Sequence, residues 1–169
     1  TDVLDPYAVL VGDSSQVTYQ GSVHLWPAQA PDSLIAPTSF ATLGFGVPAA
    51  IGSLYAREDR QTVALVGDGA LMFSVQELRT AADAGRALPI LVVDNGGYRE
   101  IAEEMDALGI ARTGVDIPPP DFAALAVAMG CAYAEAADAS ELNSALRGAL
   151  KHSGPTVVRI PDPAGVTPR

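Results

Sequence analysis

The chain has 169 residues, of which 49% are hydrophobic, and this fits one compact domain with a full apolar core rather than a disordered or fibrous protein. Ten basic residues face 20 acidic ones, and the net charge of −10 makes nucleic acid and anionic membranes poor partners. No uninterrupted apolar run is long enough to span a bilayer. The one cysteine, Cys131, lies among apolar residues, so we expect a buried structural thiol and a reducing, cytoplasmic location.

Short apolar runs without alternation favour strands that are buried on both faces. They are Tyr7 to Val11, Thr62 to Val66, Pro89 to Val93, Cys131 to Glu135 and Thr156 to Ile160. Segments of helical character lie between them: Gly46 to Arg57, Ala70 to Ala84, Arg99 to Leu108, Asp121 to Met129 and Ser140 to Lys151. This order predicts an α/β fold, a doubly wound, mainly parallel sheet with helices on both faces.

The remaining segments fit one domain over 1–169. Asp121 and Asp138 are helix start signals, and Gly85, Gly109 and Gly130 are stop signals. Residues 13–40 are less regular and are interpreted as a surface or interface segment, residues 114–120 as a connecting loop and residues 161–169 as a tail.

Gly67-Asp68-Gly69 stands where a strand gives way to a helix. Glycines on both sides of Asp68 allow a ligand to approach closely, and the N–H groups of Gly69 and Ala70 open the helix. A helix N-terminus attracts a diphosphate, and Asp68 would then face its metal ion. Alternatively, this is an ordinary strand-to-helix turn with Asp68 as its cap.

Asp94-Asn95-Gly96-Gly97-Tyr98 follows the next strand. One helix, a turn and a strand fit between the two turns, so Asn95 emerges beside Asp68 at the end of an adjacent parallel strand. Carboxylate, amide and carbonyl oxygens together with phosphate oxygens suit the octahedral shell of Mg²⁺. No lysine lies near either turn, so a bound phosphate would rely on backbone N–H groups and the metal.

These two turns resemble the thiamine-diphosphate signature of the superfamily of pyruvate decarboxylase, benzoylformate decarboxylase and acetolactate synthase. The resemblance runs from about Tyr7 to Ile160 and identifies the chain as the C-terminal domain that binds the cofactor diphosphate. It implies that Asp68, the Asn95 side chain and the Gly97 carbonyl ligate Mg²⁺. The family usually has Asn where this chain has Asp94, which either adds negative charge or caps the turn.

Thr42 to Gly52 also resembles this superfamily, where the residue matching Leu43 wedges beneath the cofactor and the carbonyl matching Ala41 holds its aminopyrimidine amine. Without the resemblance, Gly44, Gly46 and Ala49 imitate a dinucleotide fingerprint. The fingerprint fails because no strand precedes it and Pro48 falls in the phosphate turn.

Asp13-Ser14-Ser15-Gln16 follows the first strand and resembles the family segment that binds the diphosphate through hydroxyls. Ser14 and Ser15 are the candidates, and the alternative is a helix cap by Asp13 or Ser14. His24 is interpreted as structural.

Tyr98 opens a helix that lines the substrate pocket in the family, and Tyr98 completes the candidate cofactor residues. Gly97-Tyr98-x-Glu100-Ile101 resembles decarboxylases that act on 5-guanidino-2-oxopentanoate, so Glu100 is the candidate for pairing with a guanidinium. Glu103 and Glu104 are interpreted as a solvated face.

The resemblance implies thiamine diphosphate and Mg²⁺ as cofactors, and a 2-oxo acid decarboxylase or carboligase, for which a 5-guanidino-2-oxopentanoate or benzoylformate substrate is considered. Alternatives are an acetolactate synthase-like carboligase or the β subunit of a split decarboxylase. The glutamate that activates the cofactor comes from another domain in this family. We therefore expect a pyrimidine-binding domain or subunit as partner, a homo-oligomeric full enzyme, and no activity of this chain alone.

Two other classes remain open at this stage. A flavodoxin-like module could bind Mg²⁺ for phosphorylation through Asp13 and Asp68, but its lysine should lie near the last strand and Lys151 precedes it. A nicotinamide or flavin oxidoreductase is the other class, and it fails on the fingerprint.

Overall fold

A computed structural model, which describes residues 3–162, contains a six-stranded parallel sheet. Its strands are β1 (Val9–Gly12), β2 (Leu34–Ile35), β3 (Thr62–Gly67), β4 (Leu88–Asp94), β5 (Ala132–Glu135) and β6 (Pro155–Pro161). The order across the sheet is β2-β1-β3-β4-β6-β5. The chain winds outward to β2 and then returns past β1 to β3, so a crevice is expected outside the carboxyl ends of β1 and β3.

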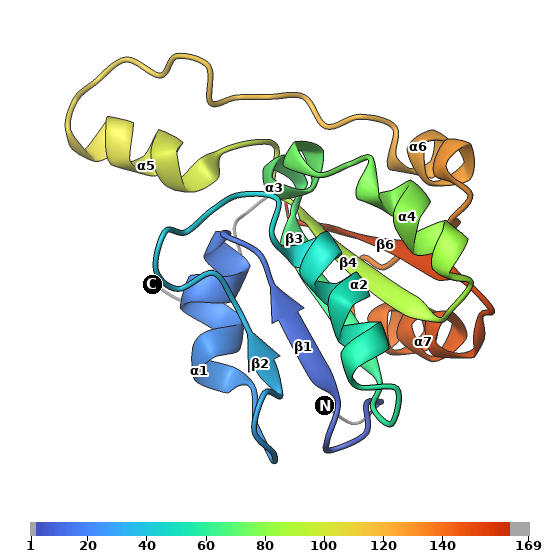
Figure 1. Ribbon diagram of the computed structural model, residues 1–169. Helices are drawn as coiled ribbons and strands as arrows, with labels where there is room; N and C mark the ends of the chain where they lie inside the picture. Colours follow the sequence, from blue (N-terminus) through green and yellow to red (C-terminus); the bar gives the residue numbers. More distant parts are fainter. Residues whose placement is uncertain (1–2, 163–169) are drawn as a thin grey trace.

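Three helices cover one face of the sheet (Figure 1): α2 (Gly46–Ala56), α4 (Glu77–Ala84) and α6 (Phe122–Met129). The larger core lies between them and the sheet. It includes Val66, Ile90 and Val92 from the strands and Leu78 from α4, and none of these four side chains is exposed. The central strands β1, β3 and β4 are almost wholly buried, as the lack of alternation in the sequence predicts, whereas β5 at the edge is half-buried.

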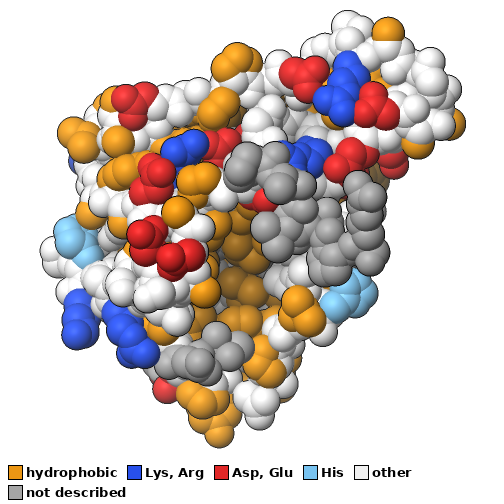
Figure 2. All heavy atoms as spheres, turned by 180° about the vertical axis from the view of Figure 1, so that it is seen from behind, with side chains coloured by type: hydrophobic (Ala, Val, Ile, Leu, Met, Phe, Trp, Pro, Cys, Tyr) orange, Lys and Arg blue, Asp and Glu red, His pale blue; other side chains and the backbone are white. Residues whose placement is uncertain are grey.

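The second face carries the π-helical turn η1 (Val17–Ser22), α1 (Val23–Leu25) and α7 (Ala139–Lys151). Between them lies a groove of about 540 Å³. Figure 2 shows it as a hollow with apolar side chains, and Leu65, Leu91 and Ile160 are among the residues that line it. Helices therefore lie on both faces, and the predicted doubly wound α/β fold is confirmed.

The helix signals are borne out at several positions. The Asp121 carboxylate accepts a hydrogen bond from the Ala124 N–H at 3.0 Å. Asp138 likewise accepts from the N–H groups of Ser140 and Glu141. Gly85 and Gly130 end α4 and α6 in left-handed backbone conformations, with φ of 60° and 80°.

Two segments differ in detail from the prediction. The less regular segment 13–40 contains three short elements, η1, α1 and β2. The single helix expected over 70–84 is two helices, α3 (Asp68–Phe73) and α4, because Ser74 leaves the helical region with φ of −134° and its N–H donates to the Leu71 carbonyl.

Pro161, expected in the tail, belongs to β6, while residues 163–169 of that tail lie outside the described residues. Cys131 is a buried free thiol, as predicted, and burial raises its pKa to about 11. No helix within residues 3–162 is both long enough and apolar enough to cross a membrane.

Leu78 tests the larger core, because its side chain is fully buried. We expect Leu78→Ala to lower the free energy of unfolding by about 2–5 kcal/mol through lost burial and a residual cavity. The matched control is Leu108→Ala, at a side chain that is 74% exposed. Urea denaturation should place that control within about 0.5 kcal/mol of the parent, and equal losses for both variants would contradict the assigned core.

Candidate functional site

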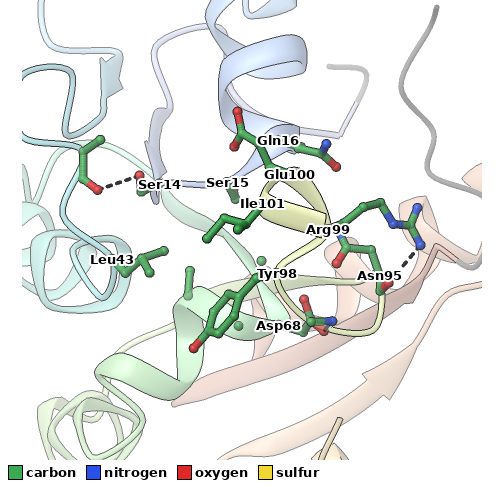
Figure 3. Close-up of a pocket in the computed structure, with 15 residues that line it drawn as sticks. Ser14, Ser15, Gln16, Leu43, Asp68, Asn95, Tyr98, Arg99, Glu100 and Ile101 are labelled. Carbon is green, nitrogen blue, oxygen red and sulfur yellow. Dashed lines mark hydrogen bonds between the residues drawn. The ribbon is translucent and has the colours of Figure 1, made fainter. Parts of the chain in front are cut away.

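The candidate cofactor residues come together in one pocket of about 230 Å³ at the carboxyl ends of β1, β3 and β4 (Figure 3). Every residue proposed from the sequence for cofactor contact lines it: Ser14, Ser15, Ala41, Leu43, Gly67, Asp68, Gly69, Ala70, Asn95, Gly97 and Tyr98. Gln16, Arg99, Glu100 and Ile101 complete the lining. Residues far apart in the sequence thus meet where a parallel sheet of this topology binds ligands.

Asp68 joins the two turns predicted to carry the metal. Its Oδ2 accepts hydrogen bonds from the N–H of Gly96 at 3.1 Å and of Gly97 at 2.8 Å. Burial raises the pKa of this carboxyl, the amides of Gly69 and Gly97 oppose that rise, and repulsion from Asp94 adds to it. The carboxylate therefore bridges from the end of β3 to the turn after β4.

Asn95 and Gly97 place further oxygen atoms beside Asp68. The Asn95 side-chain oxygen faces only acceptors, and turning the amide over would place its nitrogen 3.3 Å from Asp68 Oδ1 and 3.0 Å from the Gly97 carbonyl oxygen. A carboxylate, an amide and a carbonyl thus converge on one point. Three facing acceptors are unfavourable unless a cation or a proton donor lies among them, and hard oxygens in this arrangement fit Mg²⁺.

Two glycines bring the turns close together. A Cβ at Gly69 would lie 2.7 Å from Cε1 of Tyr98, whose ring also packs against Phe73 with centroids 6.3 Å apart. Gly97 has φ of 123°, and a Cβ there would lie 2.5 Å from the Val115 carbonyl oxygen. A side chain at Gly97 would displace the backbone that carries a candidate ligand, and one at Gly69 would displace the Tyr98 ring.

Asp13 is the important site residue that is missing from the sequence-derived set. It is fully buried, and its carboxylate accepts hydrogen bonds from the N–H groups of Gly44 at 3.1 Å and Gly46 at 2.6 Å, besides that of Ser14. Burial raises its pKa, and these amides oppose the rise. Asp13 caps no helix of its own segment, where the N-cap of η1 is Gln16. It fixes the turn that presents Leu43 to the pocket.

Ser14 connects two candidate cofactor contacts. Its hydroxyl donates to the Ala41 carbonyl at 2.8 Å and pairs with the Tyr19 hydroxyl. Ala41 adopts a left-handed conformation with φ of 50°, which is strained for a residue with a side chain. Because a carbonyl oxygen has two lone pairs, Ala41 can still accept a second hydrogen bond from a ligand.

The other wall of the pocket comes from α5 (Arg99–Ala107), which arches away from the sheet (Figure 1). Glu100 and Ile101 line the pocket. Glu103 does not line it, and its carboxylate accepts a hydrogen bond from Gln16 Nε2 at 2.9 Å. Burial raises the pKa of Glu100, and repulsion from Glu104 and Glu103 raises it further. An opposite charge beside Glu100 would relieve that repulsion.

Asp94, the departure from the usual family pattern, has a partner that the sequence did not reveal. Arg159 Nε of β6 donates to Asp94 Oδ2 at 2.7 Å. Asp94 adds negative charge at the turn, as one of the two alternatives expected, and it repels Asp68, but Arg159 pairs with it. Arg99 supports the same region, since its Nη2 donates to the carbonyls of Asn95 and Asp162. Arg99 lies within the segment Tyr98-Arg99-Glu100, whereas Arg159 stands in no recognisable motif and reaches the site only because β6 lies beside β4.

The chain is similar in sequence to known proteins. Residues 13–160 match the family described as "Thiamine pyrophosphate enzyme, C-terminal TPP binding domain". A probable 2-ketoarginine decarboxylase of Pseudomonas aeruginosa is 36% identical over 88% of this chain and 26% of its own length. An acetolactate synthase large subunit of Parasynechococcus marenigrum is 31% identical over 89% of this chain and 26% of its own length.

Among solved structures, the thiamine diphosphate-dependent 4-hydroxybenzoylformate decarboxylase of Rhodococcus jostii RHA1 superposes with a TM-score of 0.83 at 29% identity. The match covers 96% of this chain and 31% of that one. The chain thus spans about a quarter to a third of the length of these relatives.

The fold and the pocket define this chain as an α/β domain that binds a cofactor at the carboxyl ends of parallel strands. The chain belongs to the family of C-terminal thiamine pyrophosphate-binding domains of thiamine pyrophosphate enzymes. Thiamine diphosphate with Mg²⁺ is the cofactor of this family, as the resemblance implies. Neither the phosphorylation module nor the nicotinamide or flavin oxidoreductase agrees with this membership.

Asp13 gives a test of the turn that carries Leu43. Asp13→Asn replaces one of the two acceptor oxygens by a donor that faces backbone N–H groups, so we expect a loss of about 1–3 kcal/mol in the free energy of unfolding. We also expect weaker binding of thiamine diphosphate. Asp121→Asn is the matched control, since the Asp121 carboxylate also accepts a hydrogen bond from a backbone N–H but is exposed and lies away from the pocket. Calorimetric titration that finds the same affinity in both variants would contradict the role of Asp13.

Proposed function

We propose that this chain holds the Mg²⁺-diphosphate end of thiamine diphosphate within a 2-oxo acid decarboxylase or carboligase. The observation that carries the proposal is the convergence of the Asp68 carboxylate, the Asn95 amide and the Gly97 carbonyl on one point. These three groups would ligate the metal. The N–H groups of Gly69 and Ala70 and the hydroxyls of Ser14 and Ser15 would contact the diphosphate, since all of them line the same pocket.

The cofactor, when bound, supplies the electron sink for decarboxylation. Leu43 enters the pocket from the wall opposite α5 and would support the bent form of the cofactor, while the Ala41 carbonyl would accept a hydrogen bond from its amine (Figure 3). Tyr98 packs on Gly69 and would close the site beside the diphosphate. The activating glutamate would come from a pyrimidine-binding domain or partner subunit of a homo-oligomeric enzyme, so the chain alone would be inactive.

For the substrate, we propose a 2-oxo acid with a cationic side chain, such as 5-guanidino-2-oxopentanoate. Support comes from Glu100, which lines the pocket, and from the 36% identity to a probable 2-ketoarginine decarboxylase. An acetolactate-type carboligase is the second candidate, favoured by the 31% identity to an acetolactate synthase. The single reduced, buried Cys131 accords with a cytoplasmic location.

Asp68 tests the cofactor site. With thiamine diphosphate and Mg²⁺ together at about 100 times the dissociation constant, the protein should gain about 2.7 kcal/mol of stability. Asp68→Ala should abolish this gain, because the metal loses a carboxylate ligand and the turn loses its acceptor. The control is Asp83→Ala on α4, whose carboxylate is exposed and pairs only locally with Arg79. Thermal unfolding with each ligand alone and with both measures the effect. An unchanged gain in Asp68→Ala would refute the metal assignment.

Glu100 tests the substrate class in the protein at its natural length. A hydrogen bond between charged groups contributes about 1.5–3 kcal/mol, so Glu100→Gln should raise KM for 5-guanidino-2-oxopentanoate by about 10- to 100-fold. The KM for benzoylformate, which carries no cation, should rise little. Glu104→Gln, one turn further along α5, is the control because Glu104 does not line the pocket. Steady-state kinetics that show equal rises for both substrates would argue against recognition of a cation.

A further inference from the structure

Asp94 is a buried carboxylate next to the candidate metal ligand Asn95. Its side chain is 4% exposed, and a charge removed from water to this extent is stable only when it is paired. Nε and Nη2 of Arg159 both lie 2.7 Å from Asp94 Oδ2. The Asp94 carbonyl also accepts a hydrogen bond from the Asp162 N–H at 2.8 Å, so β6 and the residue after it hold Asp94 through its side chain and its backbone.

The sheet topology explains how Arg159 reaches the turn. β6 lies beside β4, and Arg159 stands opposite Val92, two residues before Asp94 on the same face. On the other side, Arg159 Nη1 donates to Glu135 of β5 at 3.1 Å, and the Tyr133 hydroxyl donates to Glu135 at 2.9 Å. The guanidinium is therefore fixed between two carboxylates on neighbouring strands.

The ion pair between Asp94 and Arg159 matters because other negative charges lie at the same edge of the sheet. Asp94 and Asp68 are close enough to repel each other, and the pocket is expected to receive a diphosphate. Without the cation of Arg159, two carboxylates would face that anion from adjacent strand ends. The carboxylate of Asp94 would also lose the contact that fixes the residue before Asn95.

We propose that Arg159 is a positioning residue for the metal-binding turn, acting by neutralising Asp94 and holding it against β6. The proposal rests on the proposed function of Asp68 and Asn95. Asp94 and Arg159 then form a coupled pair. An aspartate at position 94 requires an arginine at position 159 of the neighbouring strand β6. An asparagine there, as the family usually has, would not require it.

The experiment measures the concentration of thiamine diphosphate that half-saturates the protein, at saturating Mg²⁺ and at natural chain length, by thermal shift and by calorimetric titration. Arg159→Met should raise this concentration by about 10- to 100-fold, as removal of outer partners of metal ligands does. Asp94→Asn in the Arg159→Met background should return it to within about twofold of the parent, because no buried carboxylate is then left without a partner.

Arg57→Met is the matched control. The Arg57 side chain is 32% exposed, against 30% for Arg159, and it pairs with an exposed aspartate at the opposite end of the sheet. This variant should bind like the parent. Failure of the parent to bind would refute the proposed function, whereas parent-like binding by Arg159→Met would overturn only the role of Arg159.

A loss in Arg159→Met that Asp94→Asn does not reverse would also overturn the proposal, because Arg159 would then act through another group. If Arg159→Met does not fold, Arg159→Lys and the double variant decide. The proposal requires both to fold and the double variant to bind like the parent, and a folded double variant that does not bind overturns it.

Discussion

The site depends on one carboxylate that crosses between two strands. Asp68 follows β3 directly, yet its Oδ2 accepts hydrogen bonds from the amides of Gly96 and Gly97 after β4. Adjacent parallel strands bring their carboxyl ends to the same edge, but only a side chain of this length and acceptor capacity fixes the relation between the two turns. Because these hydrogen bonds occupy Oδ2, Oδ1 is directed toward the Asn95 amide and is available to a metal ion.

An acidic chain can hold a diphosphate because its buried charges are compensated in two different ways. Asp13 and Asp68 are compensated by backbone amides, which add no net charge and also order the turns that bear Leu43 and Gly97. Asp94 has a cation, Arg159. Unpaired buried carboxylates would destabilise the fold and repel the ligand, so the polar contacts that stabilise this edge of the sheet are also those that shape the pocket.

The sequence predicts local features well and spatial neighbours poorly. Five strands, the caps at Asp121 and Asp138 and the residues that line the pocket follow from short patterns and from the family resemblance. The role of Asp13 and the pair between Asp94 and Arg159 depend on which strands are adjacent, and the order β4-β6-β5 is not written in any local pattern. The sequence does not predict the break at Ser74, because the apolar residues on either side of it keep the spacing of one continuous helix.

The proposed substrate class would follow from the same balance of charge. Glu100 lines the pocket with Glu103 and Glu104 close enough to raise its pKa, so the unliganded site holds like charges in mutual repulsion. A guanidinium would relieve that repulsion, whereas an acidic side chain would add to it and a neutral one would leave it unchanged. Discrimination would thus arise from a penalty on the wrong substrates as well as from attraction of the right one.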